Sequence, residues 1–251
     1  MLQERIHRES RIRKHYRVSL ARHDDEVRAA QRLRWQVFAE ELGARLSDTE
    51  PGYDIDLFDR YCEHLLVRES ATGEIVGTYR ILGPEAAKRV GCFYTDGEFD
   101  LTRLQHLRGR MVEVGRSCVH ADHRSGGVIA MLWSGLAEYM LRNGHEYLIG
   151  CASIGMRDGG HNAASLWHAL RQKHLAPIEW RVFPRHPLPL DAYAGIPAPV
   201  VPPLIKGYLR VGCYICGEPA WDPDFNTADL PILLPVKNVN ATYARHFLKQ
   251  S

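Results

Sequence analysis

Short hydrophobic runs alternate along the chain with polar turns, and their periods predict strands interspersed with helices. Tyr16, Val18 and Leu20 alternate with polar residues, as in a strand, whereas the acidic run 24–26 precedes apolar residues at helical spacing. The elements expected are, in order, a strand at 16–20, a helix from 24 to about 42, a hairpin of strands 63–68 and 74–82, a strand at 110–120, a helix at 128–142, a strand at 146–154, a helix capped by Asn162 and ending near 174, and late strands near 213–216 and 230–236.

The pattern contains no internal repeat and no clear linker. Residues 83–109 are expected to form a loop with short helical pieces. Half of the 14 prolines lie between Pro184 and Pro203, so this stretch is expected to be a stiff surface loop. Strands mixed with helices in this way predict an α/β (α+β) fold, with residues 15–251 in one domain.

Composition excludes several classes of protein. The chain has 251 residues, 45% of them hydrophobic and 25% charged, which is typical of a globular protein. No apolar run is long enough for a membrane span, and the Arg-rich N-terminus lacks the apolar segment of a secretory signal. Six dispersed cysteines predict buried, reduced thiols and a cytoplasmic protein. Aromatic residues are not interleaved with basic ones, which argues against nucleic-acid binding.

Positive charge gathers at the N-terminus. The net charge is +2, but residues 1–22 hold seven Lys and Arg against two Glu. Residues 1–14 are therefore predicted to form a basic arm, suited to anionic lipid headgroups or to an acidic protein. A solvated chain end explains the same charges equally simply.

The stretch from Val119 to Val128 is the most informative segment. A strand ends, a turn with Gly126 and Gly127 follows, and a helix begins. Amides at a helix N-terminus favour an anion, glycines let a phosphate approach, and Arg124 adds positive charge. A tight turn that needs glycine is the structural alternative. The turn lacks the dinucleotide and triphosphate fingerprints.

Glu113 lies inside an otherwise apolar strand. A carboxylate there is costly unless it is paired, so Glu113 is a candidate for catalysis or for an ion pair with an arginine. In a regular strand the side chain of Arg116 lies on the face opposite Glu113, unless Gly115 marks a bulge that changes the alternation of side chains. Cys118 is close by, but no His–Asp pair accompanies it as in a cysteine nucleophile.

Other charged residues and cysteines leave alternatives open. Asp56 and Asp59 can bind a cationic side chain or a cation, or can cap the next element. Arg80 can bind a substrate carboxylate as a bidentate pair, or can hold Asp59. Cys213 and Cys216 lack a second ligand pair at zinc spacing, so we interpret them as core residues and predict no metal.

Several of these motifs resemble a known superfamily. Arg124-Ser-Gly126-Gly127 after a strand that ends at Val119 resembles the acyl-donor loop of the GNAT N-acyltransferases, and Asn162 at the next helix fits that fold. Further residues occur in the order seen in acyl-homoserine-lactone synthases: Arg34 and Phe38, then Asp56 and Asp59, then Arg80, then Glu113 and Arg116. Cys118, Asp122 and a C-terminal tract with Asp224 and Asp229 differ from the synthases and are similar to the hemolysin-like branch that includes ornithine N-acyltransferases.

The resemblance implies a fold and a reaction. The fold is a single GNAT-type domain with a mixed, mostly antiparallel sheet, flanking helices and a cleft between splayed strands at 110–120 and 146–154. The reaction is transfer of a long-chain, 3-hydroxylated acyl group from acyl carrier protein to the α-amino group of ornithine, giving lyso-ornithine lipid. It requires no bound cofactor, only the phosphopantetheine thioester as co-substrate. The enzyme would then work in the cytoplasm or at the inner face of the membrane.

The resemblance also implies roles for single residues. The catalytic residues are Glu113 and Arg116, the acceptor-binding residues are Arg34, Phe38, Asp56, Asp59 and Arg80, and the donor-binding residues are Val119, Arg124, Gly126, Gly127 and Asn162. Two alternatives are acylation of another amine, such as glycine, lysine, glutamine or a homoserine-lactone precursor, and a non-catalytic protein that binds acyl carrier protein or a membrane surface.

Overall fold

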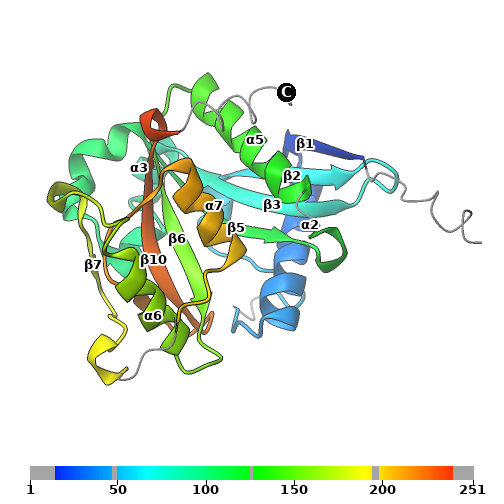
Figure 1. Ribbon diagram of the computed structural model, residues 1–251. Coiled ribbons are helices and arrows are strands. Elements are labelled where there is room, and N and C mark those ends of the chain that lie inside the picture. Colours follow the sequence, from blue (N-terminus) through cyan, green and yellow to red (C-terminus); the bar gives the residue numbers. More distant parts are fainter. Residues whose placement is uncertain (1–14, 47–49, 125–126, 194–197, 240–251) are drawn as a thin grey trace, which may run out of the picture.

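A central sheet of eight strands runs through the protein, with helices on both of its faces (Figure 1). The computed structural model describes residues 15–46, 50–124, 127–193 and 198–239. The strands lie in the order β1-β2-β3-β5-β6-β10-β8, with β9 also on β10, and β4 pairs with β7 separately. Their bounds are β1 Tyr16–Leu20, β2 Glu63–Glu69, β3 Ile75–Leu82, β4 Phe99–Asp100, β5 Met111–Val119, β6 Tyr147–Gly155, β7 Phe183–Pro184, β8 Tyr214–Ile215, β9 Ala220–Asp222 and β10 Thr227–Pro235.

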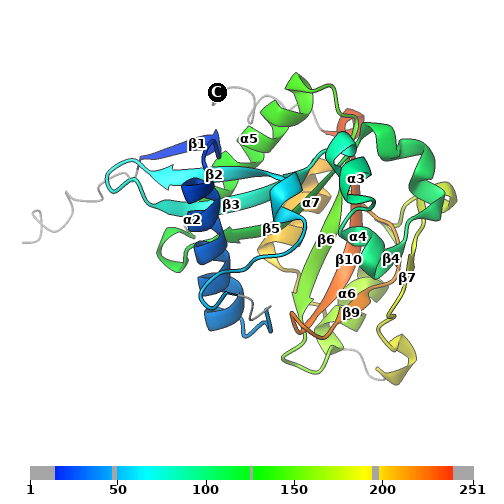
Figure 2. The ribbon, with the colours of Figure 1, turned by 180° about the vertical axis from the view of Figure 1, so that it is seen from behind.

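The helices divide between the two faces of the sheet. The described helices are α2 Asp24–Trp35 with a π-helical continuation Gln36–Glu41, α3 Pro84–Val90, α4 Thr95–Glu98, α5 Gly127–Arg142, α6 His161–Leu170 and α7 Pro203–Val211. Figure 1 shows α5, α6 and α7 in front of the sheet, and Figure 2, from behind, shows α2, α3 and α4 on the other face. We call these the α5 face and the α2 face. None of the described helices is both long and apolar enough to cross a membrane.

Strands β5 and β6 form the parallel pair of an otherwise antiparallel sheet, and they separate after three pairs of residues. Their pairing begins at Met111 with Tyr147 and ends at Glu113 with Ile149, although both strands continue. A Cβ on Gly150 would lie 2.5 Å from the carbonyl oxygen of Val114, so only glycine permits this close approach where the strands diverge. The predicted splayed cleft and mixed sheet are thereby confirmed.

A bulge in β5 decides which side chains face the cleft. The register between β3 and β5 shifts between Thr78 and Arg80, and Arg116 adopts a φ of 50°. One extra residue in β5 reverses the alternation of side chains, as a β-bulge does. Arg116 therefore lies on the same α2 face as Glu113, and the bulge considered for Gly115 is present.

Two details of the expected elements are wrong. Helix α6 begins at His161 after Gly160, so Asn162 is not its N-cap, and it ends at Leu170. Helix α7 was missed because it follows the proline-rich stretch, although Pro203 occupies its first turn, where proline is tolerated. The basic arm 1–14 and Gly126 lie outside the described residues.

Candidate active site

The gap between β5 and β6 contains a cavity of about 280 Å³. Side chains from both separated strands, from β3 and from β10 line it, and so do parts of α4, α7 and the π-helical turn after α2. The charged residues among them are Arg80, Glu113, Arg116, Asp222 and Asp229, accompanied by Phe38, Tyr94, Phe225, Tyr79 and Tyr208. Four of the predicted site residues, Phe38, Arg80, Glu113 and Arg116, therefore meet at one cavity.

Three arginines and three aspartates form a buried network on the α2 face beside this cavity. Arg34 Nε donates to Asp54 at 2.8 Å, and its Nη2 donates to Asp59 at 2.8 Å. The Arg34 side chain is fully buried. Because the three positive and three negative formal charges balance, the network tolerates burial.

The network extends to the two arginines that line the cavity. Arg80 Nη1 donates to Asp56 at 2.6 Å and to Asp59 at 3.0 Å. Arg116 Nε donates to Asp54 at 3.1 Å, and its Nη2 donates to Asp56 at 3.4 Å. Arg80 thus holds Asp59, one of the two uses that the sequence left open, while both guanidinium groups still border the cavity.

The arginines determine the protonation of Asp59. Burial alone would raise its pKa, but Arg34 and Arg80 hold the pKa well below its ordinary value of 3.8. Asp59 is therefore ionised and committed to arginine. Asp56 also accepts hydrogen bonds from Arg80 and Arg116. Neither aspartate is left as a separate negative charge for a cationic substrate.

Glu113 anchors the start of α4 while it lines the cavity. The backbone N–H groups of Tyr94 and Thr95 donate to its carboxylate at 2.7 Å, and the Thr95 hydroxyl donates at 2.5 Å. Burial raises the pKa of Glu113, and the hydrogen bonds from Thr95 and Tyr94 oppose this rise. Glu113 makes no ion pair with an arginine within 4.0 Å among the described residues, so the ion pair considered from the sequence is wrong there. Hydrogen bonds from Tyr94 and Thr95 satisfy the carboxylate instead.

A second acidic group lies at the same cleft. Asp229 on β10 faces the cavity, and its carboxylate, that of Glu98 in α4 and the Cys151 thiol have ligand atoms within 4.8 Å of one another. Burial, followed by Asp229 and Asp222, raises the pKa of Glu98 to about 9. Sequence reasoning missed this group, although Asp229 gave the same signal as Glu113: an acid inside an apolar strand.

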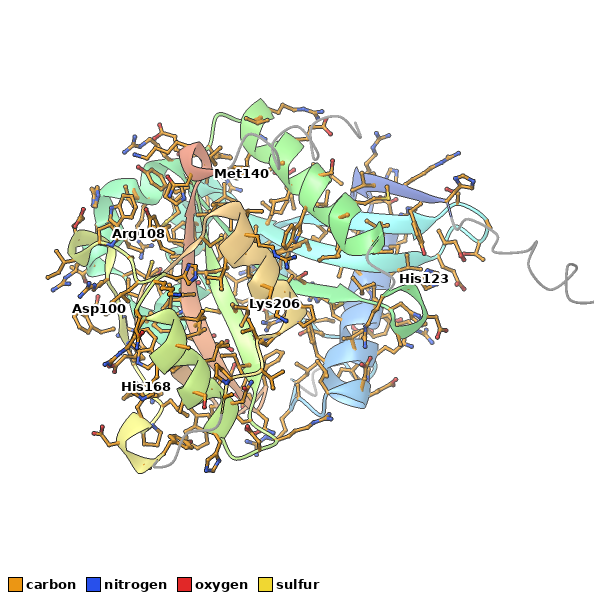
Figure 3. The ribbon with its side chains drawn as sticks, in the orientation of Figure 1. Asp100, Arg108, His123, Met140, His168 and Lys206 are labelled. Carbon is orange, nitrogen blue, oxygen red and sulfur yellow. The ribbon has the colours of Figure 1, made fainter. Side chains whose placement is uncertain are left out.

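Two of the predicted donor-binding residues line a neighbouring cavity of about 510 Å³. Val119 and Arg124 line it together with His123, which Figure 3 labels in the turn between β5 and α5. Arg124 donates from Nε to the carbonyl oxygen of Val119 at 2.9 Å and pairs with Glu41 through its other nitrogens. Gly127 is the first residue of α5.

Asn162 lies apart from the donor-binding residues. Its side chain accepts from the N–H of Val200 at 2.8 Å and donates to the carbonyl oxygen of the same residue at 3.0 Å. Both ends of the amide are therefore used to fix the proline-rich stretch. Asn162 does not line any of the cavities described above.

A third cavity, of about 260 Å³, has an almost entirely apolar lining between α5, α7 and the sheet. Figure 3 labels Met140, which lines it from α5, and Lys206 on the neighbouring α7. Tyr79 and Tyr208 border both this cavity and the cleft, and their hydroxyls are 2.7 Å apart. The two tyrosines therefore form the boundary between the charged cleft and the apolar cavity.

The cysteines near the site are neutral thiols. Cys118 packs against Leu33 and Val37, and burial raises the pKa of its thiol to about 12. Cys213 and Cys216 are buried with free thiols, as expected for core residues. A buried thiol with so high a pKa is a poor nucleophile.

The comparisons with other proteins agree with this geometry. Residues 33–134 match the family model of the acetyltransferase (GNAT) domain. The L-ornithine N(alpha)-acyltransferase of Rhodobacter capsulatus is 38% identical, over 94% of this chain and 95% of that protein. The enzyme of the same name from Brucella abortus is 35% identical, over 92% of this chain and 88% of that protein.

Solved structures share the fold at much lower identity. The acyl-homoserine lactone synthase LasI is 16% identical, with a TM-score of 0.55 over 94% of this chain and 96% of that one. The CoA-dependent acyl-homoserine lactone synthase BjaI is 15% identical, with the same TM-score over 94% of this chain and 89% of that one. At these identities the likeness concerns the fold.

Proposed function

Because this chain belongs to the family of the L-ornithine N(alpha)-acyltransferases, and is an N-acyltransferase, we propose that it acylates the α-amino group of ornithine. The donor is a long-chain, 3-hydroxylated acyl group on acyl carrier protein, and the product is lyso-ornithine lipid. One observation carries the proposal: the cleft between β5 and β6 borders arginines and carboxylates on one side and an apolar cavity on the other.

The separated strands suit the phosphopantetheine arm of the donor. Beyond Glu113 and Ile149 the facing edges of β5 and β6 no longer pair with each other. An extended chain with amide groups can bind such an edge as an added strand does. The start of α5 at Gly127, beside Val119 and Arg124, supports a site for the phosphate at the end of the arm.

The apolar cavity supports a long acyl chain. It lies directly beyond Tyr79 and Tyr208, so a chain attached at the cleft can pass the two hydroxyls before it reaches apolar side chains. The two tyrosine hydroxyls can accept a hydrogen bond from a 3-hydroxyl group of the acyl chain or donate one to it. Burial of methylene groups favours a long chain by about 0.8 kcal/mol each.

The acceptor site begins with Arg80 and Arg116. A guanidinium group matches the geometry of a carboxylate, so either arginine can bind the α-carboxylate of an amino acid. Their own aspartate partners hold both arginines in place, which favours a defined pose for the acceptor.

The reaction needs a base as well as a pose. The neutral α-amine attacks the thioester carbon and the C–N bond forms. The C–S bond then breaks with its electron pair on the phosphopantetheine sulfur, the nitrogen loses one proton, and the sulfur takes up a proton and leaves as the thiol. Three hydrogen bonds occupy three of the four lone-pair positions of the Glu113 carboxylate, so one position can receive that proton directly or through a water. Burial raises the pKa of Glu113, which makes it a stronger base.

A direct assay tests the proposal. The purified protein is incubated with L-ornithine and with a 3-hydroxyacyl chain carried either by acyl carrier protein or by coenzyme A, and the products are identified by mass spectrometry. We expect N-acylornithine, formed faster from the carrier protein. If acyl-coenzyme A is the better donor, the donor assignment is wrong. If ornithine is acylated from neither donor, the proposed function fails.

We propose further that the basic arm, residues 1–14, attracts acyl carrier protein or an anionic membrane surface. The arm carries Arg5, Arg8, Arg11, Arg13 and Lys14 against two glutamates. Truncation of residues 1–14 should weaken co-sedimentation with anionic vesicles or raise the KM for the carrier protein, and added salt should reproduce the effect. If neither quantity changes, the arm is a solvated chain end.

A further inference from the structure

Glu98 and Asp229 have carboxylates that meet beside the cleft, and neither makes a salt bridge with a basic side chain in the part of the chain that the structure describes. The side chain of Asp229, opposite Ser153 of β6, is on the same α2 face of the sheet as Glu113, and the residue is 4% exposed. Its Oδ1 and both carboxylate oxygens of Glu98 receive no hydrogen bond from the described part of the chain. The nearest arginine network is committed to Asp54, Asp56 and Asp59.

Such an arrangement destabilises a fold unless a ligand compensates it. A buried carboxylate without a counter-charge is costly, and two ionised carboxylates together would repel, so Glu98 keeps a proton at neutral pH when no ligand is bound. The groups that act on the pair include Asp222 from β9, Cys151 and Ser153 from β6 and Thr227 from β10, none of which carries a positive charge, and His186 lines a neighbouring cavity together with Glu98. The neutral groups Ser153, Thr227 and Glu98 hydrogen-bond to Asp229, but none of them supplies a positive charge, so the site lacks a counter-charge among the described residues.

The position of the pair relates it to the acceptor. Asp229 and the two arginines line the same cavity, which therefore has cationic groups at Arg80 and Arg116 and an acidic part that includes Asp229 beside Asp222, apart from Glu113 at the start of α4. Ornithine carries an α-carboxylate and a side-chain ammonium at the two ends of a chain that spans about 6 Å with ordinary bond lengths. If an arginine binds the α-carboxylate of ornithine and Asp229 binds its ammonium group, the α-amine lies between these two protein groups, beside the separated strands.

We propose that Glu98 and Asp229 bind the side-chain ammonium of the acceptor amino acid and so determine its identity. This proposal rests on the proposed function. An ammonium group has three N–H donors and can satisfy the free oxygens of both carboxylates at once. Cys151 completes the wall of the subsite as a neutral thiol.

The chemistry of the subsite favours an ammonium group over a metal ion. Burial raises the pKa of Cys151 well above its ordinary value, so the thiolate that a soft metal ion requires is disfavoured. Glu98 retains a proton at neutral pH, because its pKa is about 9. An ammonium group displaces one proton there and does not need the thiol to ionise.

The test compares ornithine with norvaline, which has the same carbon chain without the side-chain amine. The ratio of kcat/KM for ornithine to that for norvaline is measured in wild type, Glu98→Gln and Asp229→Asn at a saturating donor concentration. Asp100→Asn is the control, because Asp100 is an exposed acid two residues after Glu98. We expect each subsite variant to lower the ratio 10- to 100-fold, the usual loss for one charged hydrogen bond, through the KM for ornithine.

A stability measurement separates a binding role from a structural one. If the carboxylates serve the substrate, Asp229→Asn removes an uncompensated buried charge and raises the melting temperature at pH 8 while it lowers the ratio. A lower melting temperature together with an unchanged ratio means that Asp229 is structural, and the proposal is overturned.

Four further outcomes overturn the proposal. Wild type that uses norvaline as well as ornithine recognises no side-chain ammonium. Activity that EDTA removes and zinc or magnesium restores means that a metal ion fills the site. Ornithine acylation with an unchanged ratio in both variants overturns the subsite alone, whereas wild type that acylates no amino acid overturns the proposed function as well.

Discussion

The buried arginine network makes a prediction that does not depend on substrate. Arg34→Met removes the guanidinium group that joins Asp54 to Asp59 and keeps an unbranched apolar side chain that fits the same helix. The two carboxylates lose their shared partner while they stay buried, at 2% and 6% exposure. The variant therefore tests whether compensation of buried charge holds the α2 face together.

The magnitude follows from the partners that remain. Removal of one member of a buried ion pair costs about 3–5 kcal/mol. Arg116 still donates to Asp54, and Arg80 still donates to Asp59. We therefore expect a loss near the lower end, about 3 kcal/mol in the free energy of unfolding.

The assay is equilibrium urea unfolding of wild type and Arg34→Met at pH 7.5, with Arg28→Met as the matched control. Arg28 lies on the same helix and pairs with Glu50, but the two side chains are 39% and 46% exposed. An exposed pair contributes about 0–1 kcal/mol, so the control should lose far less than Arg34→Met. Equal losses in the two variants would refute the reasoning.

The pH dependence provides an independent check. The native pKa of Asp59 lies below its unfolded value of 3.8, so its contribution to stability is complete above that pH and is lost as the pH falls below it. Wild type and Arg34→Met should therefore converge in stability below pH 4. A difference that stays constant with pH would mean that Arg34 stabilises by packing.

Three other variants have clear expectations. Glu113→Gln should lower kcat about 10²–10⁴-fold at neutral pH, with partial recovery at higher pH where free amine is more abundant, and a loss below threefold in initial rate would make Glu113 purely structural. Cys118→Ala should keep its initial rate within about threefold, because the thiol pKa of about 12 excludes a nucleophile, whereas a hundredfold loss would reinstate it. Gly150→Ala should lose about 1–3 kcal/mol in urea unfolding, because its Cβ meets the Val114 carbonyl, while Gly155→Ala on the same strand meets nothing within 4 Å and should not.

The hydrophobic periodicity predicted strands and helices well where the element's own residues also carried its start or stop signal. The helix beginning at Asp24, the hairpin after Glu63 and the helix before Arg142 occur near their expected bounds, because each carries both an apolar pattern and a start or stop signal. Helix α7 has a strong apolar side too, but the prolines before it obscured its start. The prediction that Asn162 caps a helix was wrong, because an asparagine near the start of a helix need not be its N-cap residue.

The site was predictable one residue at a time but not as a set. Glu113 was a candidate because a carboxylate in an apolar strand is costly to bury without a partner or a function, and the same argument applies to Asp229. Glu98 carries no such local signal, because its burial depends on β10, which lies far along the chain. The face of Arg116 likewise depended on a backbone angle that the sequence Gly115-Arg116 does not determine.

The distribution of charge suggests how the cleft distinguishes among amines. Arg34, Arg80 and Arg116 are each balanced by aspartates, so the network can orient a carboxylate without adding a large net charge of its own. Glu98 and Asp229 have no such arginine partner among the described residues, and in the subsite proposed above the ligand supplies the positive charge. Glycine or glutamine would leave both carboxylates unsatisfied. Rejection of an acceptor that lacks the ammonium group would then follow from unpaired protein groups, which discriminate more strongly than the fit of an apolar pocket.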